Sequence, residues 1–454
     1  RKFWGPPRVR EGKQQGVHGE RRRVAVAQDD AHALAITLSE PPVITAPELP
    51  GRPAPKSMTE DPRDRSPLVM KFGGSSVADL ERLRKVARIV VARAQTQPVV
   101  VVVSAMGKTT DALVEQAKAL HPQATAREMD MLLSTGERTS MAMLALAVAS
   151  QGQAAISLTG SQCGIITDHR HGRARIVEVR PFRILDELAL GQVVIVGGFQ
   201  GVSYKREVTT LGRGGSDTTA VALAASLGGD CEIYSDVDGV YSTDPRVVPE
   251  AIRLEELSFE NMRAMSRAGA KVLHAQAVKL AERADISIFA RATDGRPGQS
   301  EIRRLPKAPR SGVQAVVCDR DTLWVRVEGR HPELAPKLLE LGFISLRQSD
   351  AMLEARAHLS QRDDADAVAD GLAAACKALG CEVARSQRLA TLTCVGSALE
   401  DHPELLIRAH AAFAQHDIEV LHMVSEVTGY SFAIDIAHAE AANRALHDAL
   451  IDSD

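Results

Sequence analysis

The sequence predicts an α/β protein with a mostly parallel sheet covered on both faces, followed by two smaller α+β modules. From residue 68 onward, short continuously apolar runs alternate with helical segments, which is typical of strands buried on both faces. After about residue 306 this alternation ends, and one strand–turn–helix–strand pattern occurs twice. The 454 residues, 44% of them hydrophobic, are enough for two or three domains.

The first region alternates strands with helices. The expected strands are 68–72, 98–104, 154–158, 193–196 and 232–235, and the expected helices are 80–94, 110–120, 139–149 and the alanine-rich segment that ends before Gly229. Ligands of such sheets bind where strands end and helices begin, so polar residues at these turns are the candidates for a site.

The second region contains an internal repeat. Its first copy is strand 322–328, the turn His331-Pro332-Glu333, a helix to 341 and strand 343–348; its second is strand 390–395, the turn His402-Pro403-Glu404, a helix to 416 and strand 418–424. Each copy continues into a further strand (352–359 and 430–436) and an alanine-rich helix. We therefore expect an extension over 1–66, a first domain over 67–305, a linker and first module over 306–386, and a second module over 387–454, with a basic, Pro-containing linker at 303–310.

The extension 1–66 is rich in Pro, Arg, Gly and Glu and shows no helical or strand period, which indicates disorder. It has no apolar core typical of a secretory signal. Met58 stands shortly before the first strand, and we hypothesise that translation starts near it.

Bulk composition excludes several functional classes. The formal charge of −3, with both signs interspersed, gives no footprint for nucleic acid or an anionic membrane. The longest apolar run, 98–105, is far short of the roughly 20 residues that cross a bilayer. Six scattered cysteines without a CxxC pair indicate reduced core thiols and a cytoplasmic protein. The 14 histidines form no HExxH motif, so a structural zinc site is not expected.

A lysine and two glycines stand at the end of the first strand, in the stretch KFGGSS from Lys71 to Ser76. Gly73 and Gly74 would let a phosphate approach the backbone, a helix N-terminus adds positive partial charge, and Lys71 adds a full charge. A tight turn with a surface lysine would give the same pattern, so both interpretations stay open.

The stretch VVVSAMGKT over 101–109 ends like a P-loop, but the first glycine of that motif would fall at Val102, which excludes it. Ser104 and the turn 108–111 could line a ligand cleft or simply cap a helix.

Three more polar stretches lie on expected strand-to-helix turns or strand ends. STGER, 134–138, is expected to open a helix, where Glu137 either binds a ligand or complements the helix dipole. LGRGGSD, 211–217, places a cation, glycines, a hydroxyl and a carboxylate at a helix mouth that favours anions. YSDVDGVYSTDPR, 234–246, forms a polar loop whose residues, taken singly, are also turn formers.

Together the stretches KFGGSSV, SAMGKTTD, REMDMLLSTGE, LTGSQCGIITD, GGFQGV, TTLGRGGSDTTAVALAASLG, CEIYSDVDGVYSTDPR and AGAKVLH have the order and spacing of the aspartate kinases. The chain resembles this family, part of the amino-acid kinases, from Val69 to about Ile302. Its C-terminal repeat resembles, less closely, the paired ACT modules that follow this kinase domain. The resemblance implies the carbamate-kinase-like three-layer fold and the ATP-dependent phosphorylation of the L-aspartate side-chain carboxylate to 4-phospho-L-aspartate. That reaction is the first step toward lysine, threonine and methionine.

The resemblance also implies roles for individual residues. Lys71 stabilises the transferred phosphoryl group, and Asp217 orients Lys71 and helps to organise Mg²⁺-ATP. Arg213 binds the α-carboxylate and Glu137 the α-ammonium of aspartate. The implied substrate contacts are Ser75, Glu137, Arg213, Gly214, Gly215 and Ser216. The implied nucleotide contacts are Lys71, Phe72, Gly73, Gly74, Ser104, Ser216, Ser235, Asp236, Tyr241, Arg246 and Lys271. Mg²⁺ is expected through the ATP phosphates, without a dedicated protein cage.

The substrate is its own nucleophile in this reaction. An aspartate carboxylate has a reference pKa of ~3.9 and is ionised at neutral pH, so no general base is needed. The task is to bring two anions together and to neutralise charge on the phosphoryl group.

The sequence departs from the family at several positions. Ser235 replaces a usual threonine and Ala275 a common proline, both mild changes. The turns before the first helix of each module read His-Pro-Glu where the family carries Pro-Gly, so the binding of a lysine or threonine effector there is altered. Segment 313–318 is similar to the strand that completes the distal module, and by analogy we expect a homodimer.

Two alternative functions remain at this point. One is a related kinase for acetylglutamate or glutamate, against which Glu137 argues, because an N-acetylated substrate has no ammonium for it to bind. The other is a non-catalytic amino-acid sensor, against which the intact Lys71, Arg213 and Asp217 argue.

Overall fold

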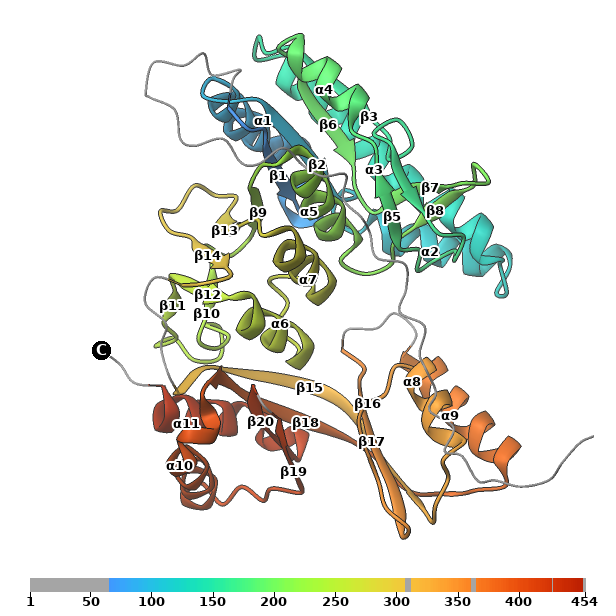
Figure 1. The fold of residues 1–454 in the computed structure, drawn as a ribbon, viewed down its shortest axis with the longest axis vertical. Helices are drawn as coiled ribbons and strands as arrows, with labels where there is room; N and C mark the ends of the chain where they lie inside the picture. Colours follow the sequence, from blue (N-terminus) through green and yellow to red (C-terminus); the bar gives the residue numbers. More distant parts are fainter. Residues whose placement is uncertain (1–64, 307–311, 361–364, 427, 452–454) are drawn as a thin grey trace, which may run out of the picture. The chain divides into compact units, whose positions relative to one another are not determined.

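The computed structural model describes residues 65–306, 312–360, 365–426 and 428–451 (Figure 1). The expected extension, apart from its last two residues, and Met58 lie outside the described residues, as does the end of the expected linker 303–310. No described helix combines the length and the apolar character that a membrane span requires.

The first region is built on an eight-stranded sheet in the order β12-β14-β13-β9-β1-β2-β6-β3. Every pairing in it is parallel except that of β13 with β14, so the expected mostly parallel sheet is confirmed. The strands are β12 (Glu256–Ser258), β14 (Ser300–Arg303), β13 (Ile288–Ala292), β9 (Cys231–Ser235), β1 (Leu68–Phe72), β2 (Val99–Val103), β6 (Val193–Gly197) and β3 (Ala155–Leu158).

The register of the central strands brings three polar turns to one edge of the sheet. Phe72 pairs with Val103 of β2 and with Tyr234 of β9, so β1, β2 and β9 end side by side. The residues that follow these strand ends are therefore neighbours at the carboxyl edge of the sheet, where ligands of parallel sheets bind.

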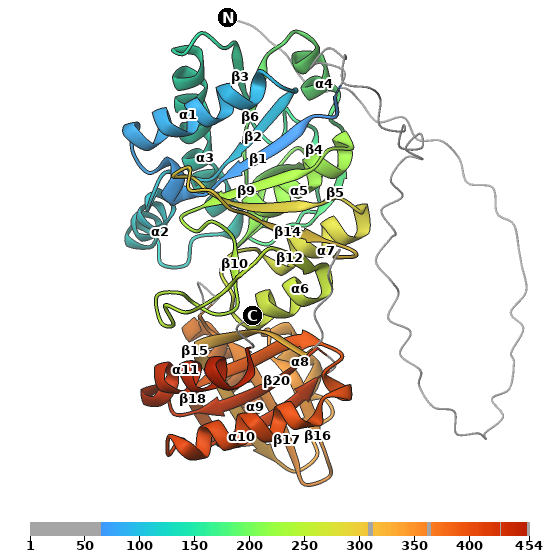
Figure 2. The ribbon, with the colours of Figure 1, turned by 90° about the vertical axis from the view of Figure 1, so that its left-hand side faces the viewer.

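Helices cover both faces of this sheet, giving three layers (Figure 1; Figure 2). One face carries Met70, Phe72, Val101 and Val103 against α1 and α3, and the other carries Val69, Val100 and Val102 against α5, α6 and α7. The helices of the region are α1 (Leu80–Ala94), α2 (Thr109–Leu120), α3 (Ala126–Ala149), α4 (Phe182–Ala189), α5 (Gly215–Leu227), α6 (Phe259–Ala268) and α7 (Ala275–Ala284).

Two smaller sheets accompany the main sheet. Strands β5 (Ile176–Val179), β4 (Ile165–Thr167), β7 (Gln200–Ser203) and β8 (Val208–Thr210) form one of them in that order, and β10 (Val240–Tyr241) pairs with β11 (Arg253–Leu254). The strand β8 leads directly into the glycine-rich turn before α5, so this sheet helps to place that turn.

The second region forms one six-stranded sheet in the order β16-β17-β15-β18-β20-β19, with antiparallel pairings throughout. Its elements are β15 (Gly312–Glu328), α8 (Leu334–Glu340), β16 (Ile344–Gln348), β17 (Met352–His358), α9 (Ala365–Leu379), β18 (Val383–Ser397), α10 (Pro403–Gln415), β19 (His422–Glu426), β20 (Gly429–Ile434) and α11 (Ala439–Leu450).

Two of these strands are longer than expected, because each runs through both modules. The first part of β15 pairs with the end of β18, from Val313 with Gly396 to Cys318 with Leu392, and its later part pairs with β17. Separate helix pairs cover the two halves of the sheet, α10 and α11 on one hydrophobic cluster and α8 and α9 on another. The nominal boundary at 386/387 falls inside β18. The strand expected over 418–424 begins only at His422.

The second sheet makes direct contacts with the first region. The Val316 backbone N–H donates to the Ser242 carbonyl at 2.7 Å, and Thr243 Oγ1 donates to Asn443 Oδ1 at 3.0 Å. Ala315 and Val395 join the hydrophobic cluster that contains α6.

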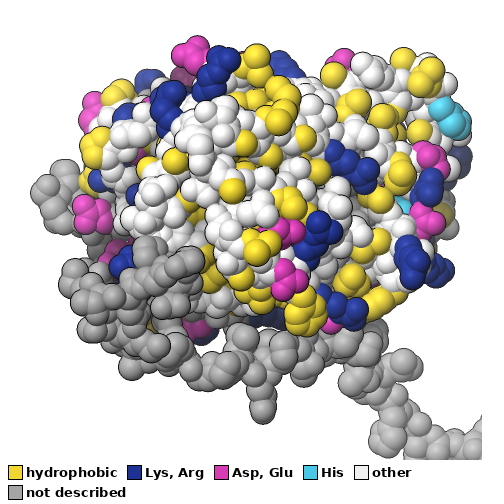
Figure 3. All heavy atoms as spheres, turned by 90° about the horizontal axis from the view of Figure 1, so that it is seen from above, with side chains coloured by type: hydrophobic (Ala, Val, Ile, Leu, Met, Phe, Trp, Pro, Cys, Tyr) yellow, Lys and Arg dark blue, Asp and Glu magenta, His cyan; other side chains and the backbone are white. Residues whose placement is uncertain are grey.

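The cysteines and the surface charges bear on the expectations drawn from composition. All six cysteines are free and five are buried, as expected for reduced core thiols. On the face seen in Figure 3, basic and acidic side chains are interspersed with hydrophobic ones, so neither sign of charge dominates it.

Candidate active site

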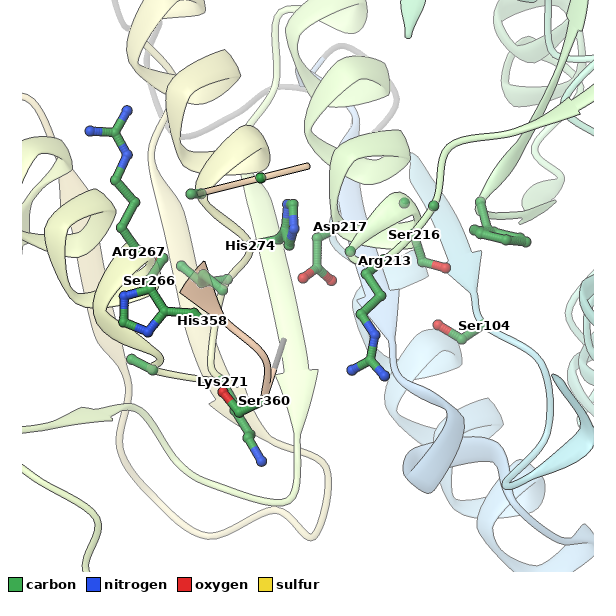
Figure 4. A pocket seen from close by; sticks show the side chains of 18 of the residues that line it. Ser104, Arg213, Ser216, Asp217, Ser266, Arg267, Lys271, His274, His358 and Ser360 are labelled. Atoms are coloured by element: carbon green, nitrogen blue, oxygen red, sulfur yellow. The ribbon is translucent and has the colours of Figure 1, made fainter. Parts of the chain in front are cut away.

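A large open cavity of about 2040 Å³ lies at the carboxyl edge of the main sheet (Figure 4). It is bounded by the ends of β1 and β2, the middle of α3, the turn before α5 and the loop before α7, and it continues toward β17. Of the predicted site residues it is lined by Lys71, Gly74, Ser104, Glu137, Arg213, Gly214, Gly215, Ser216, Asp217 and Lys271. Residues from five separate stretches of the sequence thus share one cavity.

A lysine–aspartate ion pair stands in this cavity. Lys71 Nζ lies 2.7 Å from Asp217 Oδ1, and only 13% and 11% of the two side chains is exposed. Lys71 belongs to β1 itself, because the strand runs to Phe72. Asp217 lies in the first turn of α5. The carboxylate therefore fixes the ammonium group at the point where the strand end and the helix N-terminus meet.

The glycines of the turn before α5 have packing reasons to be glycine. Gly214 has φ +67°, and a Cβ there would come within 2.2 Å of the His274 ring. A Cβ on Gly215 would lie 2.8 Å from the Phe199 ring. These contacts hold the first turn of α5 against the α7 loop and the β6–β7 turn, leaving the helix N-terminus directed at the cavity, where it favours anions.

The glycines after β1 differ from one another. A Cβ on Gly74 would lie 2.8 Å from the Ala105 carbonyl oxygen, so Gly74 allows the turns after β1 and β2 to pack closely. At Gly73 the nearest atom to such a Cβ would be Lys71 Nζ at 3.6 Å. Of the two, Gly73 is therefore the one beside the ammonium group, whereas Gly74 is the one that lines the cavity.

The sequence predicts that Glu137 lies at the start of a helix, but in the structure it lies in the middle of α3. The apolar pattern from 139 onward hid the preceding polar turns of the same helix. Gly136 allows α3 to approach the turn after β2, since a Cβ there would lie 2.9 Å from the Ala105 side chain. The helix-dipole interpretation of Glu137 is therefore wrong.

The Glu137 carboxylate is buried, with 4% of the residue exposed. Its Oε1 accepts a hydrogen bond from the Ala105 backbone N–H at 3.1 Å, while Oε2 has no hydrogen-bond partner among the described residues. Burial raises the pKa of Glu137 to about 7. A buried acid with one unused oxygen is suited to bind a cation from a ligand.

Arg213 is exposed and extends from the turn before α5. Figure 4 shows its guanidinium reaching into the cavity, with Ser216 and Ser104 nearby. The preceding Gly212 has φ +75° and packs on the Gly172 carbonyl, which sets the direction of the turn.

Several predicted residues do not line the cavity. The side chain of Phe72 is fully buried and stacks on Tyr234 with ring centroids 4.6 Å apart, so only its backbone could meet a nucleotide. The Ser75 carbonyl accepts from Arg82 Nη1 at 2.6 Å. The loop after β9 is tied internally: Ser235 Oγ bonds within its own turn, Tyr241 donates to Asp238, and Arg246, largely exposed, pairs with Asp244. The exposed Asp236 also lies in this loop.

Among the polar residues of the cavity that sequence reasoning missed are Asp130, Thr210 and His274. Asp130, seven residues before Glu137 on α3, is buried with 1% exposure, and Thr210 at the end of β8 bonds to it. His274 packs on Gly214, and burial lowers its pKa from the usual value. Asp130 and His274 stand inside the motifs REMDMLLSTGE and AGAKVLH, and a lone acid among apolar helix residues was the available signal.

No group of three or more His, Cys, Asp or Glu side chains within the described ranges is arranged to hold a metal ion. Asp217 is the carboxylate that lies next to Lys71. Asp217 thus offers one carboxylate donor beside the ammonium group, which fits a magnesium ion that is carried by phosphates and takes few protein ligands.

Comparison with known proteins gives one consistent result. The family model "Amino acid kinase family" matches residues 66–290. The aspartokinase of Mycolicibacterium smegmatis is 40% identical over 402 residues, covering 84% of this chain and 95% of that protein. An aspartokinase of Thermus thermophilus is 37% identical over 396 residues, covering 84% of this chain and 98% of that protein.

Among solved structures, Escherichia coli aspartokinase III in complex with aspartate and ADP has a similar fold, with a TM-score of 0.73. The superposition covers 85% of this chain and 100% of that one, at 23% sequence identity. That similarity extends over both the eight-stranded and the six-stranded sheet regions.

Proposed function

From the premise that this chain belongs to the aspartokinases of the amino acid kinase family, and phosphorylates the aspartate side-chain carboxylate with ATP, we propose how its cavity performs the reaction. The observation that carries the proposal is the Lys71–Asp217 pair, 2.7 Å apart, in one cavity with Arg213 and Glu137. Arg213 and Glu137 thus offer a cation and an anion to the charged groups of an amino acid, and Lys71 offers a second cation to the phosphoryl group.

Arg213 and Glu137 bind the two charged groups of the amino-acid head. The guanidinium of Arg213 suits bidentate pairing with the α-carboxylate. The unused Oε2 of buried Glu137 accepts from the α-ammonium group. Two opposite charges at fixed positions select an α-amino acid, and the remaining distance to Lys71 selects the length of its side chain.

Lys71 neutralises the charge that accumulates on the transferred phosphoryl group. The aspartate side-chain carboxylate attacks the terminal phosphorus of ATP, one P–O bond forms as the bond to the leaving ADP breaks, and no proton need be removed. Gly73 lies beside Lys71 Nζ, and the N-terminus of α5 adds positive partial charge through Gly215 and Ser216. Asp217 keeps the ammonium group in place throughout.

The nucleotide occupies the side of the cavity where β1, β2 and β9 end. Ser104, which follows β2, lines it there, and the polar loop of Ser235, Asp236, Tyr241 and Arg246 follows β9 at the same sheet edge. Lys271 lines the cavity from the loop before α7. Magnesium, carried by the ATP phosphates, would be held near Asp217 and would supply further charge neutralisation.

The six-stranded sheet is the proposed regulatory region. Amino-acid effectors such as lysine or threonine are proposed ligands of it, and the subunits are proposed to pair through it. At the two turns that differ from the family pattern, His331 Nε2 lies 2.8 Å from the Glu328 carbonyl and His402 Nδ1 lies 2.9 Å from Glu404. Both turns are therefore closed by their own side chains, which supports an altered effector contact.

The substrate assignment is tested with the wild-type protein in an ADP-release assay and a hydroxamate trap for the acyl phosphate. L-Aspartate is expected to turn over, and N-acetyl-L-aspartate to lose at least about 100-fold in kcat/KM, because Glu137 would be left unpaired. Equal turnover of the two compounds would contradict the role of Glu137, whereas no turnover of aspartate would contradict the function itself.

A second expectation concerns pH. Because the pKa of Glu137 is raised to about 7, kcat/KM for aspartate at saturating Mg²⁺-ATP should rise as the pH passes through that value and the carboxylate ionises. Glu137→Gln should have a higher KM for aspartate and should lose this rise. A Gln variant with the wild-type pH profile would assign the titration to another group.

The same shift affects stability. The folded pKa of Glu137 lies above its usual value of 4.5, so folding favours the protonated form. This contribution is complete below pH 4.5 and is lost as the pH rises through about 7. Chemical denaturation of the Gln variant should therefore show a smaller loss of stability across that window.

A further inference from the structure

The buried carboxylate of Asp130 contacts the two chain segments that support the Arg213 turn. Thr210 Oγ1 donates to Asp130 Oδ1 at 2.5 Å, and His171 Nδ1 lies 2.7 Å from Oδ2. The Gly172 backbone N–H is shared between the two oxygens at 3.0 and 3.2 Å. With 1% of the residue exposed, the carboxylate is surrounded by protein donors, although it lies at the cavity wall.

These contacts continue to Arg213 through the backbone. The Ala174 N–H donates to the Thr210 carbonyl at 2.8 Å, which joins the segment after β4 to the end of β8. Gly212 packs on the Gly172 carbonyl, since a Cβ on Gly212 would lie 3.1 Å from that oxygen. Arg213 is the next residue. Asp130 thus binds both the segment after β4, at His171 and Gly172, and the end of β8, at Thr210, and these two segments support the turn that carries Arg213.

Asp130 and Glu137 belong to the same helix. They are seven residues apart on α3, which is about two turns or roughly 10 Å along the axis, so both carboxylates lie on one face. Glu137 keeps one oxygen without a partner among the described residues, whereas Asp130 uses both of its oxygens on the protein. One acid of the helix is available to a ligand and the other is committed to structure.

We propose that Asp130 is a positioning residue that fixes Arg213 relative to Glu137, so that one rigid helix sets the spacing at which the carboxylate and ammonium of the amino acid are recognised. This inference rests on the proposed roles of Arg213 and Glu137. Asp130 contacts neither substrate and acts through the loop of Arg213. Its loss should therefore weaken aspartate binding without affecting ATP.

The test is steady-state kinetics of Asp130→Asn in the full-length protein, with Asp79→Asn, which alters a helix cap outside the cavity, as the matched control. Asparagine keeps the shape but replaces an acceptor oxygen by a donor facing Gly172 or His171. We expect KM for aspartate to rise by about tenfold or more, with KM for ATP unchanged and little change in kcat. In an Arg213→Ala background the same substitution should add almost nothing to KM for aspartate.

The outcomes separate this inference from the proposed function. If Arg213→Ala raises KM for aspartate but Asp130→Asn does not, or if the two effects multiply, the positioning role of Asp130 is overturned. The proposed contact of Arg213 with the α-carboxylate is then still supported. If Arg213→Ala itself has no effect on KM, the proposed site is overturned. Should Asp130→Asn fail to fold, Thr210→Val tests the same contact, because it removes the hydroxyl that donates to Asp130 and retains the side-chain shape. An unchanged KM for aspartate in that variant would overturn the positioning role of Asp130.

Discussion

Replacing Lys71 by alanine is expected to lower kcat by about 10³-fold, with a much smaller change in KM for aspartate. The ammonium group lies 2.7 Å from Asp217, at the point where β1 and the N-terminus of α5 meet. Charge on the phosphoryl group changes most between ground state and transition state, so its neutralisation affects kcat before it affects binding. Single-turnover and steady-state assays of ADP release measure this loss.

A matched control for this variant is Lys118→Ala, which removes another lysine at the wall of the same cavity, on α2. It should retain wild-type kcat. Since Lys71→Ala leaves Asp217 without its partner, the double variant Lys71→Ala/Asp217→Asn shows whether the unpaired carboxylate contributes to the defect. Near-normal kcat in a folded Lys71→Ala protein would refute the role assigned to this lysine.

Replacing Arg213 by alanine is expected to raise KM for aspartate by about 100-fold, because a charge-assisted, bidentate contact to the α-carboxylate is lost. The effect on kcat should be smaller, since this part of the substrate does not change charge during transfer. Arg213→Lys should recover only part of the affinity, because an ammonium group cannot reproduce the planar fork.

The control for Arg213 is Arg267→Ala. Arg267 lines the same cavity from α6, and Figure 4 shows it well separated from Arg213. If general attraction of an anion to a basic cavity determined KM, both variants would weaken binding alike. An unchanged KM for aspartate in Arg213→Ala, or an equal rise in Arg267→Ala, would contradict the proposed binding of the α-carboxylate by Arg213.

Much of the fold could be predicted from local sequence. The run Val99–Val103, buried at every position, could only be a strand of a covered sheet, and the alternation of such runs with helices implied parallel pairing. The repeated His-Pro-Glu turns predicted two related modules, and the structure has one six-stranded sheet whose two halves carry separate helix pairs. The strands β15 and β18 could not be predicted at full length, because their continuity depends on pairing with each other across both modules.

The candidate site was predicted only in part. Lys71, Arg213 and Asp217 stand in polar turns at expected strand ends and helix starts, where ligands of such sheets bind, but their individual roles came from the resemblance to the aspartate kinases. Glu137 was identified, but with the wrong local structure, since the apolar residues after it suggested a helix start. Asp130 was overlooked, because its partners Thr210, His171 and Gly172 lie at least 41 residues away in sequence.

The sequence by itself determined where the main parallel strands and several of their helices form and which residue types reach the strand ends, because period, glycine content and charge are local properties of the chain. Only the tertiary structure decided which of those ends share a cavity and which acids are committed to protein donors. Pairing register and side-chain burial arise from contacts between distant segments. A helix can therefore present two similar carboxylates of which one is left for a ligand.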